Sequence, residues 1–172
     1  MGVADHRHGA PTRLRIAVVS VSTSRTLDQD ESGHWIGREV KKNGHELAGH
    51  QVVPDDAAAI REHLLALLAD PDPDAVLVTG GTGISPTDVT IEAVRPLFDK
   101  ELTAFNVLFT QLSFEQIDSA ALLSRAVAGV IGHCLVFCMP GSLKACRLAC
   151  TELIFPEIGH MAKHVQANGR GG

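Results

Sequence analysis

The sequence predicts an α/β fold of three layers, with helices on both faces of a mostly parallel central sheet. Two observations support this prediction. Short apolar runs rich in valine, such as residues 75–78, do not alternate with polar residues, which is typical of strands buried on both faces of a parallel sheet. Segments with helical spacing lie between these runs, so that strand and helix alternate along the chain.

Composition and charge narrow the class of protein. A chain of 172 residues, 45% of them hydrophobic, is large and apolar enough for one domain with a substantial core. Its formal charge of −5, with no basic run longer than Lys41-Lys42, argues against nucleic-acid binding. The chain shows no signal-peptide pattern and no segment as long as a membrane span, so we expect a cytoplasmic protein with no membrane partner. We predict a disordered tail over residues 1–13, the α/β domain over 14–166 and a flexible C-terminus over 167–172.

The first two strand-helix units are expected in residues 14–69. A strand over 14–21 should end at a hydroxyl-rich segment that contains Ser22, and a helix capped by Ser32 should run to about residue 43. A second strand over 45–53 should stop at Pro54-Asp55-Asp56. The next helix has apolar residues at helical spacing, namely Ile60, Leu64, Leu67 and Leu68. At this junction the ordinary structural role for Asp55 would be to cap the helix.

The third strand, residues 75–79, breaks into Gly80-Gly81-Thr82-Gly83 and then into hydroxyl residues around Asp88. Glycines leave no side chain between backbone and ligand and permit positive φ, so successive N–H groups can form an anion nest. A helix starting near Thr90 would add its positive end. A tight turn capped by Asp88 or Thr90 with nothing bound is the structural alternative. Gly83 is followed by Ile84 and Ser85, which excludes a Walker loop, and Pro86 excludes a dinucleotide fingerprint.

The second half of the chain is less regular. Helices are expected from Thr90 to about residue 98 and around residues 105–112, while residues 120–131 suit either a strand or a buried irregular segment. Residues 134–139 predict another interior strand, which ends at Pro140-Gly141-Ser142. A helix over about 143–150 should follow, with Pro156 as a break or kink and one or two further turns to residue 166.

Metal and nucleophile patterns in this half are weak. The cysteines lack the Cys-x-x-Cys spacing of zinc knuckles, so we expect buried, reduced thiols at Cys134, Cys138, Cys146 and Cys150. His160 and His164 lie four apart, but Met161 replaces the glutamate of a metalloprotease motif, and solvated helix histidines are expected.

Four segments taken together resemble one family. They are Thr79-Gly80-Gly81-Thr82-Gly83, Asp88-Val89-Thr90-x-Glu92-Ala93, Ser124-Arg125-x-Val127-Ala128-Gly129 and Met139-Pro140-Gly141-Ser142-x-Lys144. In this order they resemble the molybdopterin-binding family of molybdenum-cofactor biosynthesis, the MoaB and MogA type, over residues 14–158. The segment Leu112-Ser113-Phe114-Glu115-x-Ile117 is most similar to the MoaB branch.

The resemblance implies a homotrimer or homohexamer that binds molybdopterin. Active members of the family transfer AMP from Mg-ATP to the terminal phosphate of molybdopterin. By motif match, Asp55 and Asp88 would be the catalytic and magnesium-binding carboxylates. The residues expected to contact phosphate or molybdopterin are Gly80, Gly81, Thr82, Gly83, Ser142, Ser22 and Ser124.

Two positions depart from the family pattern. Val107 replaces a glutamate in the segment after Glu101, and Ser22 is followed by Thr23 in place of Asp or Asn. The retained Asp55 and Asp88 favour an adenylyltransferase, whereas the departures favour a molybdopterin carrier without catalysis. A phosphate-binding protein of another pathway is the third hypothesis.

Overall fold

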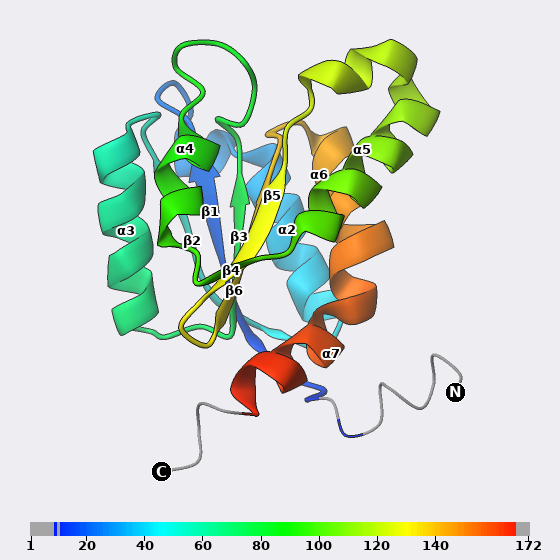
Figure 1. The fold of residues 1–172 in the computed structure, drawn as a ribbon. Coiled ribbons are helices and arrows are strands. Elements are labelled where there is room, and N and C mark those ends of the chain that lie inside the picture. The colour runs from blue at the N-terminus through cyan, green and yellow to red at the C-terminus, as the bar shows by residue number, and fades with distance from the viewer. Residues whose placement is uncertain (1–8, 10, 168–172) are drawn as a thin grey trace.

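The computed structural model describes residue 9 and residues 11–167, so most of the predicted N-terminal tail and of the predicted C-terminal segment lies outside the described residues. One six-stranded sheet organises the described chain, with strand order β2-β1-β3-β6-β5-β4 (Figure 1). Its strands are β1 (Arg15–Val21), β2 (Glu46–Val53), β3 (Ala75–Thr79), β4 (Lys100–Glu101), β5 (Val127–Ile131) and β6 (Cys134–Met139).

The strands β2, β1, β3 and β6 run parallel to one another. Strands β5 and β4 continue the sheet at one edge with antiparallel pairing. From β1 the chain passes first to β2 on one side and then to β3 on the other, so the order reverses between β1 and β3. In open α/β sheets ligands bind outside the carboxyl ends of strands at such a reversal.

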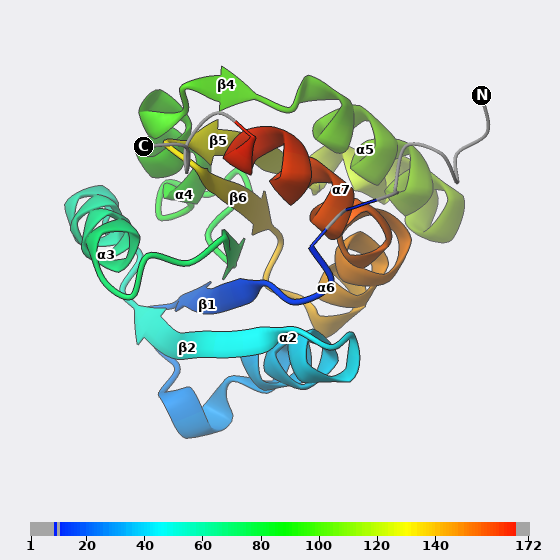
Figure 2. The ribbon, with the colours of Figure 1, turned by 90° about the horizontal axis from the view of Figure 1, so that it is seen from below.

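Helices cover both faces of the sheet, as Figures 1 and 2 show. They are α2 (Glu31–Lys42), α3 (Ala57–Ala69), α4 (Thr90–Val94), α5 (Thr103–Ile117), α6 (Leu143–Leu148) and α7 (Phe155–Gln166). Helices α3 and α4 pack on one face, and α2, α5, α6 and α7 pack on the other. The predicted three-layer α/β/α fold is confirmed. Among the described residues, no helix combines the length and apolar character needed to cross a membrane.

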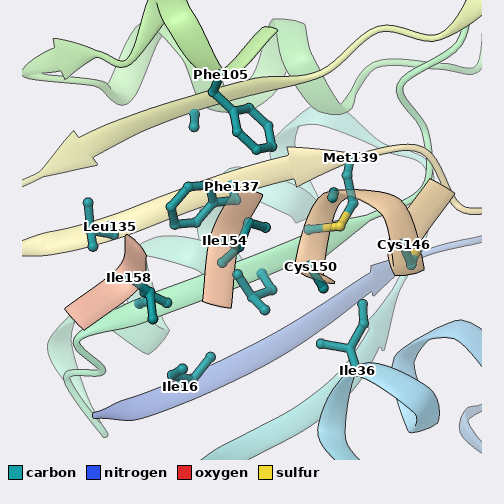
Figure 3. Packing of buried hydrophobic residues seen from close by; sticks show 14 of the residues in the cluster. Ile16, Ile36, Phe105, Leu135, Phe137, Met139, Cys146, Cys150, Ile154 and Ile158 are labelled. Carbon is teal, nitrogen blue, oxygen red and sulfur yellow. The ribbon is translucent and has the colours of Figure 1, made fainter. Parts of the chain in front are cut away.

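Alternate residues of each central strand enter two separate cores. In β1, Ile16 and Val18 face the α2 side, while Ala17 and Val19 face the α3 side. This two-sided burial explains why the strands are apolar without alternation. On the α5 side, Figure 3 shows Phe105 directed toward Phe137 of β6, and their ring centroids lie 5.4 Å apart in an edge-to-face arrangement.

Several element boundaries differ from the sequence prediction. Helix α2 is capped by Asp30, whose Oδ1 accepts a hydrogen bond from the Gly33 N–H at 3.1 Å, so the expected cap at Ser32 was wrong. Helix α4 ends at Val94 and passes into a 3₁₀ turn over Arg95–Leu97 that contains a proline. The two-residue strand β4 was not predicted, because its exposed residues carry no apolar pattern.

The C-terminal helical region is more continuous than expected. A π-helical segment, Ala149–Ile154, joins α6 to α7, and Pro156 lies in the first turn of α7, directly after this irregular segment. Helix α7 is twelve residues long, which exceeds the one or two turns predicted. Within it, Nε2 of His160 lies 2.9 Å from Nε2 of His164, so these two side chains bond to each other as well as facing solvent.

Candidate functional site

A cavity of about 250 Å³ lies at the carboxyl ends of β1, β3 and β6, where the strand order reverses. All of the predicted site residues except Ser142 line it, together with residues that were not predicted. The lining residues are Ser20, Val21, Ser22, Arg25, Asp30, Val52, Asp55, Thr79, Gly80, Gly81, Thr82, Gly83, Asp88, Leu123, Ser124, Pro140 and Gly141.

Ser142 lies beside this cavity rather than in it. Its side chain caps α6 by accepting a hydrogen bond from the Ala145 N–H at 3.2 Å. It lines a smaller neighbouring pocket with Lys144, and the two pockets share Ser124 and Pro140.

The glycine loop after β3 has a conformation that only glycine adopts easily. The φ angles of Gly80 and Gly81 are +96° and +66°. A Cβ at Gly80 would overlap the Val21 carbonyl oxygen, and a Cβ at Gly81 would overlap Oγ1 of Thr90. That hydroxyl donates to the Gly80 carbonyl at 2.8 Å, and the Thr90 N–H donates to the Gly81 carbonyl at 2.9 Å. The loop is therefore closed tightly against the start of α4.

Helix α4 itself has no side-chain cap. Its N-cap residue is Val89, so neither Asp88 nor Thr90 serves the capping role that the structural alternative assigned to them. The side chains of both residues are engaged with the glycine loop instead.

Arg125 fixes the same loop from the other side. Its Nε donates to the carbonyl oxygens of Thr82 at 2.8 Å and Gly83 at 3.0 Å. Its two terminal nitrogens form a bidentate pair with Glu92 on α4, at 2.7 and 3.1 Å. The hydrogen bond from Arg125 holds the pKa of Glu92 below its ordinary value, against a weaker effect of burial. Arg125 belongs to one of the recognised motifs, but nothing in the sequence alone shows that it braces the loop.

Asp55 is oriented by Thr23. The N–H and Oγ1 of Thr23 both donate to Oδ2 of Asp55, at 2.7 and 2.9 Å, and Thr23 Oγ1 accepts from the Asp55 N–H at 3.0 Å. The cap of α3 is the next residue, Asp56, which accepts from the Ala59 N–H at 2.8 Å. The capping role considered for Asp55 was therefore wrong, and its Oδ1 faces the backbone of Gly81.

Asp88 is held by its own turn. The N–H and hydroxyl of Ser85 donate to its Oδ2 at 2.9 and 2.6 Å. The Ser85 hydroxyl is the main cause of a lowered pKa for Asp88; burial opposes it weakly, and the N–H groups of Ser85 and Gly83 and the charge of Arg125 add to it. A Cβ at Gly83 would lie 2.6 Å from Oδ2 of Asp88, so the glycine leaves room for this carboxylate.

A second carboxylate-containing group borders the cavity. Oδ2 of Asp30 lies 2.6 Å from Nε2 of His50, and Ser20 Oγ lies nearby without ordinary hydrogen-bond geometry. Burial raises the pKa of Asp30, but Ser20, the Gly33 N–H and His50 together outweigh burial and lower it. Sequence reasoning missed this group because Asp30 and His50 belong to different elements and form no motif.

None of the four cysteines lines the cavity. All four are free and buried, as predicted. Burial raises the pKa of Cys146, the thiol nearest the cavity, and its Sγ lies 3.1 Å from Oγ1 of Thr79. A buried thiol with a raised pKa is a poor nucleophile. No group of three or more His, Cys, Asp or Glu side chains among the described residues is arranged to hold a metal ion.

Comparison with known proteins gives the family. Residues 17–160 match a family model described as a probable molybdopterin binding domain. The chain belongs to this family. It is 45% identical over 162 residues to molybdenum cofactor biosynthesis protein B of Bacillus cereus, which covers 94% of this chain and 96% of that protein.

Solved structures of the family have the same fold. A crystal structure of a molybdenum cofactor biosynthesis protein B matches with a TM-score of 0.89 and 44% identity, over 92% of this chain and 99% of the other. The tungsten cofactor synthesizing protein MoaB from Pyrococcus furiosus matches with a TM-score of 0.79 and 38% identity, over 91% and 99%. The resemblance to the MoaB and MogA type is thus confirmed.

The two departures from the family pattern lie in different places. Val107 is 63% exposed on α5 and is not among the residues that line the cavity. Thr23 acts at the site, because it supplies the two hydrogen bonds that orient Asp55.

The residues present fit a magnesium ion brought by a nucleotide. Asp55 and Asp88 line one cavity, and the bonds from Thr23 and Ser85 engage Oδ2 of each carboxylate. Mg²⁺ in nucleotide sites typically takes one or two carboxylates and completes its shell with water and phosphate oxygens. Two carboxylates that line one cavity suit that pattern.

Proposed function

We propose that the chain binds molybdopterin in this cavity and transfers AMP from Mg-ATP to its terminal phosphate. The observation that carries the proposal is the cavity itself, in which a positive-φ glycine loop and two oriented carboxylates meet at one sheet edge. The family match supports molybdopterin as the ligand.

The reaction joins two anionic partners. An oxygen of the molybdopterin phosphate forms a bond to the α-phosphorus of ATP, and the bond from that phosphorus to the pyrophosphate oxygen breaks. The nucleophile is already ionised, so no general base is needed, and catalysis depends on positioning and charge neutralisation. Asp55 and Asp88 would hold the magnesium ion, which supplies charge neutralisation to the nucleotide phosphates when bound.

This chain's own residues contribute position. The Gly80 N–H donates to the Met139 carbonyl at 3.0 Å and the Gly83 N–H faces the Asp88 carboxylate, so the N–H groups of Gly81 and Thr82 would approach the phosphate. Thr23 and Ser85 keep the two carboxylates aimed into the cavity, and Arg125 keeps the loop closed. Ser22 and Ser124 add hydroxyl donors at the cavity wall. Ser142 would contact the ligand only if part of the ligand extends into the neighbouring pocket.

We also propose a homotrimer or homohexamer that works in the cytoplasm. Helix α5 and the following 3₁₀ turn η3 (Asp118–Leu123) expose a row of large apolar side chains, which are Val107, Leu108, Phe114, Ile117, Leu122 and Leu123. Exposed apolar surface of this kind commonly marks a protein interface. Four free cysteines fit a reducing compartment.

The deciding experiment measures AMP transfer to molybdopterin with Mg-ATP. We expect transfer by the natural chain and a loss of about a hundredfold or more in Asp55→Asn and Asp88→Asn, whose folds remain intact by circular dichroism. Asp56→Asn is the matched control, because it removes the adjacent carboxylate, which caps α3, and asparagine also caps helices.

Other outcomes would change the assignment. Molybdopterin binding without transfer would leave a carrier of the same pathway. Absence of molybdopterin binding would leave a phosphate-binding protein of another pathway. Transfer by both variants at the natural rate would remove the two carboxylates from the mechanism.

A further inference from the structure

The Asp30–His50 pair lies at the edge of the candidate site but has no part in the proposed mechanism. Asp30 is only 1% exposed, yet it is one of the residues that line the cavity. The side chain of His50, on the neighbouring strand β2, is 9% exposed, and its Nε2 donates to Oδ2 of Asp30 at 2.6 Å. A buried carboxylate and imidazole thus adjoin the place where we expect phosphate.

The surrounding chain holds Asp30 in place. Its other oxygen, Oδ1, accepts the Gly33 N–H as the cap of α2. A Cβ at Gly33 would overlap both Asp30 Oδ2 and His50 Nε2, so the absent side chain leaves the space that the pair occupies. The residue before Gly33, Ser32, donates its hydroxyl to the Gly141 carbonyl at 2.9 Å, which ties α2 to the cavity wall. These contacts therefore fix the Asp30 carboxylate at the wall of the cavity.

A fixed carboxylate opposes an anionic ligand. In a poorly solvated wall, a like charge a few ångströms from a phosphate weakens binding by an order of magnitude or more unless it is compensated. The other titratable groups near this pair are Arg25, Asp55 and Asp88, which line the same cavity, His34, whose ring lies 5.0 Å from the His50 ring, and the Cys146 thiol. His50 differs from these groups because it has a direct hydrogen bond to Asp30.

We propose that His50 is a positioning residue that neutralises Asp30, so that a doubly charged phosphate or similar oxyanion can occupy the cavity. The inference rests on the proposed function only for the anionic character of the ligand. Asp30 supplies the helix cap that shapes the wall, and the hydrogen bond from His50 Nε2 to its Oδ2 offsets the electrostatic cost of having a carboxylate there.

The test is a double-mutant cycle with inorganic sulfate as the probe, at near-neutral pH. Binding is followed by NMR at the backbone amides of Gly80, Gly81 and Gly83. We expect His50→Gln to weaken sulfate binding about tenfold, because glutamine is neutral and leaves Asp30 uncompensated. In the double variant Asp30→Asn/His50→Gln neutral amides replace the carboxylate and its imidazole partner, and the affinity should return to within about twofold of the natural chain.

Two further variants sharpen the cycle. Asp30→Asn alone keeps a capping side chain and should bind sulfate at least as tightly as the natural chain. His34→Gln is the matched control, because it changes the adjacent histidine, which has no hydrogen bond to Asp30, and should leave the affinity unchanged.

Several results would overturn the inference. These are an unchanged affinity in His50→Gln, a weak affinity that persists in the double variant, weakened binding in Asp30→Asn, or no sulfate binding by the natural chain. If His50→Gln does not fold, the Asp30→Asn result still decides. An intact cycle without AMP transfer would refute the adenylyltransferase proposal and leave this one standing.

Discussion

Asp55 and Asp56 are neighbours in the sequence with different roles. Asp56 turns toward α3 and caps it, while Asp55 turns toward the cavity because Thr23 on the first loop holds it there. Both side chains fit the same sequence rule for a helix start. Only the distance to Thr23, a contact across 32 positions, separates a structural carboxylate from a candidate catalytic one.

The conformation of Gly81 gives a stability prediction. Gly81→Ala should lower the free energy of unfolding by about 1–3 kcal/mol, because its φ is +66° and a Cβ would overlap Oγ1 of Thr90. Urea unfolding measures the loss. Gly49→Ala is the control, since nothing lies within 4 Å of a Cβ there. Equal effects of the two substitutions would contradict a strained loop.

Asp30 gives a prediction about acid stability. Its pKa is held below the ordinary value of 3.8, so the folded state gains stability that is fully present above that value and lost as pH falls through the lowered pKa. We expect Tm to fall as the pH is lowered below about 4, and to fall less steeply in Asp30→Asn, which has no proton to bind. Thermal melts at several pH values measure this. Identical slopes for the two proteins would show that Asp30 contributes nothing to acid sensitivity.

Among the elements, the glycine loop and α4 behave as one unit because Arg125 joins them. Arg125→Lys should cost about 1 kcal/mol of stability and weaken ligand binding, since lysine cannot serve two carbonyls and a bidentate carboxylate at once. Chemical unfolding and a binding titration check the two parts. Arg95→Lys, at a single hydrogen bond to Glu101, is the control and should cost less.

An element could be predicted from the sequence when the pattern of apolar residues within it indicates its burial. The central parallel strands β1, β3 and β6 are buried on both faces, and their uninterrupted apolar runs indicate that burial. Strand β4 exists only because β5 offers it a partner, and its two exposed residues carry no signal. The predicted cap of α2 was two residues too late, because Asp30 and Ser32 are equally good caps by local sequence. In the fold the Ser32 hydroxyl donates to the Gly141 carbonyl instead, and Asp30 caps the helix.

At the scale of the whole molecule, the strand order decides what the site contains. Motifs located most of the cavity, because glycine loops and aspartates at strand ends point to one sheet edge. The motifs assigned no site role to Arg25 or Asp30, which line the cavity, or to His50, which contacts Asp30, because these roles depend on contacts between strands and helices that are distant in sequence. Ser142 was expected at the cavity and caps α6 beside it instead.

Assembly is tested on the exposed apolar row of α5 and η3. We expect Phe114→Ser/Leu122→Ser to dissociate the proposed oligomer, because both side chains, 56% and 82% exposed in the single chain, would lose an apolar contact area. Analytical ultracentrifugation measures the change in mass. Leu65→Ser is the control, as it alters an exposed leucine on α3 and should leave the mass unchanged. A monomeric natural chain would refute the assembly.

The position of β6 has a consequence for how the chain is made. It is the last strand to be synthesised, yet it lies between β3 and β5 in the middle of the sheet. A nascent chain that has not yet released β6 from the ribosome therefore has one unpaired edge on β3, which still pairs with β1, and a detached β4–β5 ribbon, both open to wrong partners. It also lacks the Pro140–Gly141 wall, so the complete cavity forms only in the final fifth of translation.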